Sequence, residues 1–310
     1  MIRLPTYLQG GPTSSKLEEQ FMSQISAAMV KELRERTGQG MMDCKKALTA
    51  AGGDIEKAID DMRAAGSIKA AKKAGNIAAE GAIGVKLADD SKSAVIIEVN
   101  SQTDFLALQE DFKGFVSDSL DKAFAAGYSE AAPLIAEQET AREALVAKCG
   151  ENVNIRRLTR VEGDVVGAYL HGHRIGVVVT LKGGDAELAK DIAMHVAASN
   201  PQFLDASQVS EEAVAKEKEI FLALNAEKIA GKPDNIVENM VKGRINKFLS
   251  EASLVEQAFI KDPEVKVGEL AKKAGAEILS FVRYEVGEGI ERAEVDFAAE
   301  VAAQIAATKQ

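Results

Sequence analysis

The sequence predicts an α+β protein with more than one domain, and three observations support this prediction. The chain has 310 residues, about twice the length of a common single domain. Its hydrophobic pattern is helical at first, becomes strand-like near residue 80, and is helical again between residues 208 and 249. A plan of two strands followed by a helix occurs twice, beginning at Glu80-Gly81 and at Glu162-Gly163. We therefore expect a core of two related subdomains with helical segments around it.

Residues 1–21 are interpreted as a leader or fusion segment that is not native. They show neither helical nor strand periodicity, and they lack the apolar stretch of a secretory signal. A helical pattern begins soon after Met22, which we interpret as the native start. A transit peptide is the alternative, but Glu18 and Glu19 argue against it.

Residues 22–75 are predicted to form an N-terminal domain of three short helices with a basic linker. Ser26 and Asp54 are suited to cap the first and third helices, and Gly38 is suited to end the first. The segment has ten basic and seven acidic residues, and the excess lies in Lys69–Lys73. We interpret that stretch as a solvated linker, with docking of an acidic partner and contact with RNA as alternatives.

Two subdomains follow, residues 76–161 and then residues 162–207 with 250–293, and each uses the plan of two strands and a helix. The expected strands and helices, in chain order, are 82–87, 93–99 and 111–126 in the first subdomain, then 164–170, 175–181, 185–198 and a last strand at 276–284 in the second.

A helical hairpin at residues 208–249 interrupts the second subdomain. Ser210 is suited to cap its first helix, and apolar residues recur along both helices on either side of a Gly-Lys-Pro-Asp turn. An antiparallel coiled-coil arm is the natural interpretation. Residues 294–310 are expected to form a short Ala-rich C-terminal helix.

The composition excludes several classes of protein. Hydrophobic residues make up 46% of the chain, yet no apolar run is long enough to cross a membrane. The formal net charge of −10 argues against binding to DNA and against RNA binding as the main role. Cys44 and Cys149 are too few and too far apart for a disulfide framework, which fits a reducing cytoplasm.

The sequence offers little support for catalysis. His171 and His173 flank a glycine in a predicted turn, and His195 lies on an amphipathic helix. None of these has the companions that a metal site or a catalytic triad needs, so we expect no catalytic residue, metal or cofactor. An enzyme that uses a cleft around the three histidines is kept as a rival hypothesis.

Two segments carry apolar side chains in unusual places. Phe105 lies among polar residues between a buried strand and a helix. It either packs into the core at a helix start capped by Asp104, or it is exposed and enters a pocket of a partner. In the second segment, Met42 is exposed for partner contact if Met41 faces the helical core, or both methionines fill that core.

Several motifs together resemble the family of bacterial translation elongation factors Ts. The resemblance extends from Met22 to Gln310, and Ser101 is a small departure because many members have Cys there. The matching segments are VKELRERTGQGMMDCKKAL at 30–48, EVNSQTDF at 98–105, NIRR at 154–157, IAMH at 192–195 and the tail at 281–298.

The resemblance implies a guanine-nucleotide exchange factor, without bond chemistry, for the GTPase elongation factor Tu. It also implies a UBA-like N-terminal domain and leaves open a homodimer of the complex. An RNA-binding translation accessory protein is the alternative. By resemblance the residues that bind the partner are Lys31, Arg34, Met41 and Met42 in the N-terminal domain, Thr103, Asp104, Phe105 and Leu106 beside the Mg²⁺ site, and His195 in the core.

Overall fold

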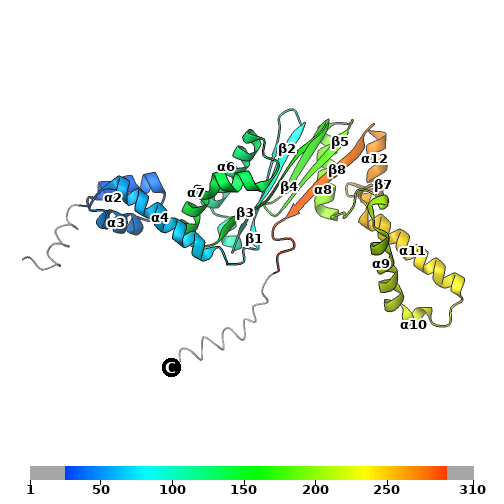
Figure 1. The fold of residues 1–310 in the computed structure, drawn as a ribbon. Helices are drawn as coiled ribbons and strands as arrows, with labels where there is room; N and C mark the ends of the chain where they lie inside the picture. Colours follow the sequence, from blue (N-terminus) through cyan, green and yellow to red (C-terminus); the bar gives the residue numbers. More distant parts are fainter. Residues whose placement is uncertain (1–24, 292–310) are drawn as a thin grey trace, which may run out of the picture. The chain divides into compact units, whose positions relative to one another are not determined.

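Figure 1 shows the computed structural model, which describes residues 25–291 of the chain. The interpreted leader at 1–21 and the predicted C-terminal helix at 294–310 lie outside the described residues. The chain divides into two compact units. The first unit comprises Met1–Asn76 and Glu139–Val153, and the second comprises Ile77–Gln138 and Asn154–Gln310. Helices and sheets both contribute, so the predicted α+β class is confirmed.

The first unit is built on three helices, and its predicted caps are present. The Ser26 hydroxyl accepts from Met29 N–H, and the Asp54 carboxylate accepts from Lys57 N–H. Gly38 ends the first helix in the left-handed conformation. The helices are α2 (Ala27–Thr37), α3 (Met41–Ala50) and α4 (Ile55–Lys73). Their buried core consists of Val30, Leu33, Cys44, Leu48, Ala58 and Ile59.

The basic stretch Lys69–Lys73 forms the end of α4, with Lys69 and Lys72 exposed. It continues α4, because residues 139–149 of α7 (Ala131–Cys149) pack along that helix. Ser67 Oγ donates to Glu143 Oε1 at 2.7 Å, and a Cβ at Gly66 would lie 3.5 Å from the Ala147 Cβ. This second layer of contacts stabilises the last turns of α4.

The second unit contains two sheets of three strands that pack face to face. Gly176 marks their closest approach, because a Cβ there would lie 2.5 Å from Ile83 Cγ2 of the other sheet. The first sheet has β1 (Glu80–Leu87), β2 (Ser93–Ser101) and β3 (Val153–Glu162), and the second has the order β4 (Val165–His171), β5 (Ile175–Lys182) and β8 (Glu277–Glu285). The interface between them buries Ile83, Ala94, Ile96, Val166, Val178, Tyr284 and Val286.

A helix covers the outer face of each sheet. Helix α6 (Glu110–Ala126) packs on the first sheet, where Gly84 lies against Val116. Helix α8 (Ala186–Ser199) packs on the second sheet, where Val177 and Val179 join its buried residues. Because Val178 points the opposite way into the interface between the sheets, both faces of β5 are buried.

The segment between α8 and β8 contains a helical hairpin, which we call the arm (residues 211–252). It pairs α9 (Glu211–Leu224) with α11 (Asp234–Ala252), joined through α10 (Ala226–Ile229). Ser210 caps α9, as predicted, by accepting from Ala213 N–H. A short hairpin follows, β6 (Ala258–Phe259) with β7 (Asp262–Lys266), and then α12 (Val267–Lys273). Nothing in residues 25–291 forms a helix that is both apolar and long enough to span a bilayer.

Candidate functional site

The segment with Thr103, Asp104, Phe105 and Leu106 forms a single exposed helical turn that is held from below. It is α5 (Asp104–Ala107), and it follows directly from the buried strand β2. Ser101 Oγ donates to the carbonyl of Thr103 at 2.8 Å, and the Thr103 hydroxyl accepts from Leu106 N–H at 3.3 Å. Leu106 is buried, so its side chain anchors the turn in the second unit.

Phe105 projects from this turn into solvent, with 76% of its surface exposed. The interpretation in which its ring packs into the core is therefore wrong. The cap is also different from the predicted one, because Thr103 caps the turn while Asp104 is its first residue and is exposed. An apolar ring of this size exposed on a constrained turn is the type of side chain that anchors protein interfaces.

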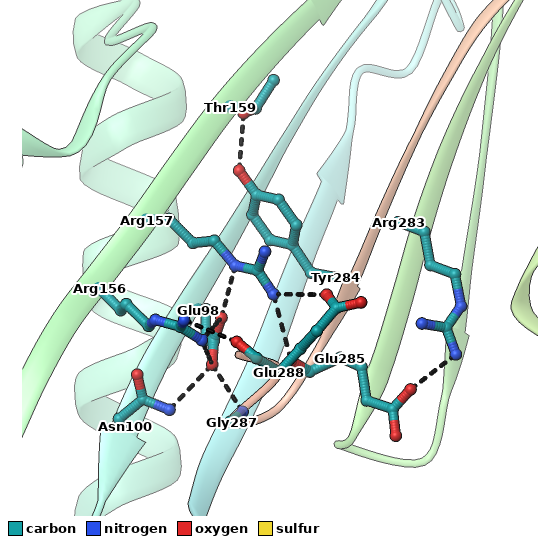
Figure 2. Close-up of polar contacts among 10 residues, drawn as sticks. All are labelled: Glu98, Asn100, Arg156, Arg157, Thr159, Arg283, Tyr284, Glu285, Gly287 and Glu288. Carbon is teal, nitrogen blue, oxygen red and sulfur yellow. Dashed lines mark hydrogen bonds and ion pairs between the residues drawn. The ribbon is translucent and has the colours of Figure 1, made fainter. Parts of the chain in front are cut away.

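Upstream of this turn in the chain, Glu98 of β2 occupies the centre of a polar cluster (Figure 2). Its side chain has no exposed surface, and five hydrogen bonds surround its two oxygens. Arg156 of β3 contacts both oxygens at 3.1 and 3.2 Å, and Arg157 Nε donates at 2.5 Å. Gly287 N–H donates at 2.8 Å and Asn100 Nδ2 at 2.9 Å. We call Glu98, Asn100, Arg156, Arg157 and Gly287 the Glu98 cluster.

The Glu98 cluster ties the first sheet to the end of β8 in the second. Arg156 Nη2 donates to the Glu288 carbonyl at 2.7 Å, and Arg157 Nη2 donates to the Glu285 carbonyl at 3.2 Å. The Arg157 guanidinium also lies 3.9 Å from the centre of the Tyr284 ring. Strands distant in sequence are thus joined at the edge where β2 leads into α5.

Burial raises the pKa of Glu98, but hydrogen bonds from Gly287 and Asn100, and the charge of Arg157, outweigh it. The pKa of Glu98 therefore lies below its ordinary value. The carboxylate is ionised at neutral pH, which suits its role as the acceptor for every surrounding donor.

The predicted partner residues of the first unit are all exposed. Lys31 and Arg34 lie one turn apart on α2, and Met41 and Met42 form the first turn of α3. The two methionines are 57% and 65% exposed. Neither fills the helical core, so Met42 is exposed as one alternative expected, but Met41 does not face the core in either of the two ways considered. This first turn of α3 lies outside the helical core, because the buried residues of α3 begin only at Cys44.

His195 lies on α8 and has no exposed surface. Ile260 N–H donates to its Nδ1 at 3.2 Å, which places the proton on Nε2, and Nε2 donates to Gln257 Oε1 at 2.9 Å. Gln257 in turn donates to the Glu251 carbonyl at 2.6 Å. His195 therefore joins α8 to the end of the arm and to the β6–β7 hairpin.

Burial lowers the pKa of His195, and the hydrogen bond with Gln257 offsets only part of that effect. The folded state therefore binds fewer protons at this site than the unfolded state does below about pH 6.5. Above that pH, we expect His195 to add no pH dependence to the free energy of unfolding. As the pH is lowered from 6.5 through the depressed pKa, the free energy of unfolding should fall. Urea unfolding at pH 7 and pH 5.5 measures this loss.

The His195→Asn variant is expected to lose stability at pH 7 and to show a smaller further loss at pH 5.5 than wild type. His171→Gln is the matched control, because His171 is exposed at the end of β4. It should keep the wild-type pH dependence. An equal pH dependence in wild type and His195→Asn would contradict the assignment.

The described residues do not support the rival enzyme hypothesis. His171 Nδ1 shares a 3.1 Å hydrogen bond with the Tyr169 hydroxyl at the end of β4, whereas His195 is a fully buried residue of α8. Between residues 25 and 291, no three His, Cys, Asp or Glu side chains are arranged to hold a metal ion. His171 and His195 therefore have different surroundings and different hydrogen-bond partners.

Sequence reasoning missed the Glu98 cluster. The signal was present, because Glu98 interrupts an otherwise apolar strand, and a carboxylate in such a place must find cationic partners. Arg156 and Arg157 were noted only as part of a motif. No strand was predicted for them, so nothing placed them beside β2.

Comparisons with known proteins agree with the motifs described above. A family model described as "Elongation factor TS" matches residues 102–288. Elongation factor Ts of Azotobacter vinelandii is 85% identical over 289 residues, which cover 93% of this chain and 100% of that protein. The proteins of the same name from Pseudomonas aeruginosa and Stutzerimonas stutzeri are 84% and 80% identical over the same shares. The chain therefore belongs to the elongation factor Ts family.

Proposed function

We propose that the protein is a guanine-nucleotide exchange factor that acts on the GTPase elongation factor Tu. It binds the GDP form, promotes GDP release by disturbing the Mg²⁺ and phosphate site, and stabilises the nucleotide-free GTPase until GTP binds. The observation that carries the proposal is the 76% exposed Phe105 on a turn anchored by Leu106. Membership of the elongation factor Ts family supports the choice of partner.

Exchange of this kind needs no covalent chemistry, so the protein is proposed not to be an enzyme in the usual sense. A factor that binds the nucleotide-free GTPase better than the GDP form weakens GDP binding by the same factor. Mg²⁺ neutralises the phosphate charge, so moving its ligands removes much of the nucleotide's attraction. Each tenfold change requires about 1.4 kcal/mol of differential contact between the two forms.

The four residues of the segment have different roles in this mechanism. Phe105 enters a pocket of the GTPase and Asp104 presents its carboxylate beside it, because both side chains are exposed. Thr103 and Leu106 hold the turn in shape, one by capping it and the other by anchoring it in the core. The turn therefore reaches the partner already ordered, which reduces the entropy cost of binding.

The first unit supplies a second contact. Lys31 and Arg34 provide charge, while Met41 and Met42 provide flexible apolar surface that adapts to a partner. We propose that this UBA-like domain, residues 22–75, docks onto the GTPase domain.

The remaining assignments follow from family membership and are proposed with it. His195 is buried and does not contact the partner directly. It contributes to partner binding by holding the β6–β7 hairpin through Ile260. The arm acts as a coiled coil, and the protein works in the cytoplasm. A homodimer of the complex is one assembly in which the arm could serve.

Release of fluorescent GDP from elongation factor Tu tests the proposal directly. The loaded GTPase is mixed with an excess of unlabelled GDP, with and without increasing amounts of this protein. We expect release to accelerate manyfold and to saturate as the exchange factor is added. No acceleration would refute the proposal, and RNA binding with a steep salt dependence in its place would favour an RNA-binding accessory protein.

A further inference from the structure

The Glu98 cluster lies directly upstream of the exposed turn in the chain, and hydrogen bonds hold the backbone on both sides of the Asn100–Ser101 peptide bond. Glu98 accepts from Asn100 Nδ2, which also donates to the Glu80 carbonyl of β1 at 3.1 Å. The next residue, Ser101, holds the Thr103 carbonyl, and Thr103 caps the turn that carries Phe105. The residues that follow the buried carboxylate in the chain are thus held by two adjacent sets of hydrogen bonds, and the turn with the exposed ring comes next.

The Glu98 cluster is more extensive than the register of one strand requires. The pairing of β1 with β2 already fixes the register of β2 along its whole length, with Glu80 opposite Ser101. Glu98 adds contacts to β3 and to the turn after β8, which belong to two different sheets. A single ionised group, fully enclosed, fixes the position of the end of β2 relative to both sheets.

We propose that Glu98 is a positioning residue for nucleotide exchange. It does not touch the partner, because its side chain has no exposed surface. It acts by holding the end of β2 rigidly, so that Phe105 meets the GTPase in one orientation. This inference rests on the proposed function and adds to it the residue that orients the exposed ring.

The positioning role predicts a specific kinetic effect. Docking through Lys31, Arg34 and the methionines does not involve the Glu98 cluster, so the concentration that gives half-maximal stimulation should change little. The maximal rate of GDP release should fall, because it depends on the orientation of Phe105 once the complex has formed. Loosening a connected network of this kind changes coupling by about tenfold.

Glu98→Gln is the variant of choice, because it keeps the shape of the side chain. It replaces one carboxylate oxygen, an acceptor, by an amide NH2 group, a donor, which then faces an arginine. We expect its maximal release rate to fall about tenfold, with less than a twofold change in half-saturation. In a Phe105→Ala background the same substitution should have almost no further effect. Arg156→Ala, which removes two contacts to Glu98 from a partly exposed side chain, should act in the same direction if Glu98→Gln does not fold.

Tyr284→Phe is the matched control. It removes the 2.7 Å hydrogen bond to Thr159 within the same part of the sheets, but it keeps the ring under Arg157 and all contacts of Glu98. Thermal unfolding of each variant shows whether it is folded at the assay temperature. The inference is overturned if Tyr284→Phe slows release as much as Glu98→Gln, if only half-saturation changes, or if the effects of Glu98→Gln and Phe105→Ala simply add. The proposed function survives those outcomes as long as the wild type accelerates release.

Discussion

Replacing Phe105 by alanine is expected to slow stimulated GDP release about thirtyfold, while leaving the fold intact. A central aromatic side chain in an interface contributes about 2 kcal/mol or more, and this energy corresponds to that factor. The ring adds nothing to this chain's own core, since 76% of it is exposed, so its removal should not lower the unfolding temperature. The rate at saturating exchange factor, followed with fluorescent GDP, measures the effect.

The control for Phe105→Ala is Leu279→Ala, which removes another exposed apolar side chain from β8. It should release GDP at the wild-type rate. A Phe105→Ala protein that is folded and stimulates release as well as wild type would show that the exposed ring is not the group that acts on the GTPase.

Replacing Gly287 by alanine is expected to destabilise the second unit by about 3 kcal/mol or more. Gly287 has a φ of 75°, a conformation that costs a non-glycine residue about 1 kcal/mol. A Cβ there would also lie 2.2 Å from the Ala79 carbonyl oxygen, so the turn must move. When the turn moves, the Gly287 N–H leaves Glu98, and the buried carboxylate loses one hydrogen-bond donor. This loss costs about 1–3 kcal/mol more. Urea unfolding measures the loss.

Gly289→Ala separates these causes. Gly289 has nearly the same backbone conformation, with a φ of 74°, but a Cβ there would lie 3.9 Å from Arg156 Nη2, an ordinary contact. We expect it to cost only about 1 kcal/mol. If the two alanine variants lost the same stability, the close contact with Ala79 and the bond to Glu98 would have no energetic importance.

The sequence predicted most of the α+β core because its signals are local. Ser26, Asp54 and Ser210 cap the helices that their positions indicated, and the two buried strands β2 and β5 were found as apolar runs. Helix α7 and strand β3 were missed for opposite reasons. The apolar residues of α7 are spread around the helix, and β3 carries arginines on a strand that is only half buried. Neither element has the periodicity that reveals a buried face.

The candidate site was predictable only in part. Its location after a buried strand marked Phe105, but whether the ring points in or out depends on the cap, and Thr103 rather than Asp104 provides it. The Glu98 cluster depends on contacts between residues about 60 to 190 positions apart, such as Glu98 with Arg157 and with Gly287. No local pattern encodes such a pairing. The roles of the partner-binding residues stay predictions until exchange is measured.

The small number of buried residues in the arm has a consequence for local unfolding. Within the described helix α9 no residue is buried, and in α11 only Ala252 is. Contacts such as the 2.6 Å pair between Arg244 and Glu217 hold the two helices together with little apolar burial. Backbone amides of the arm should therefore exchange with deuterium through local fraying, long before those of β5, which exchange only when the whole second unit unfolds.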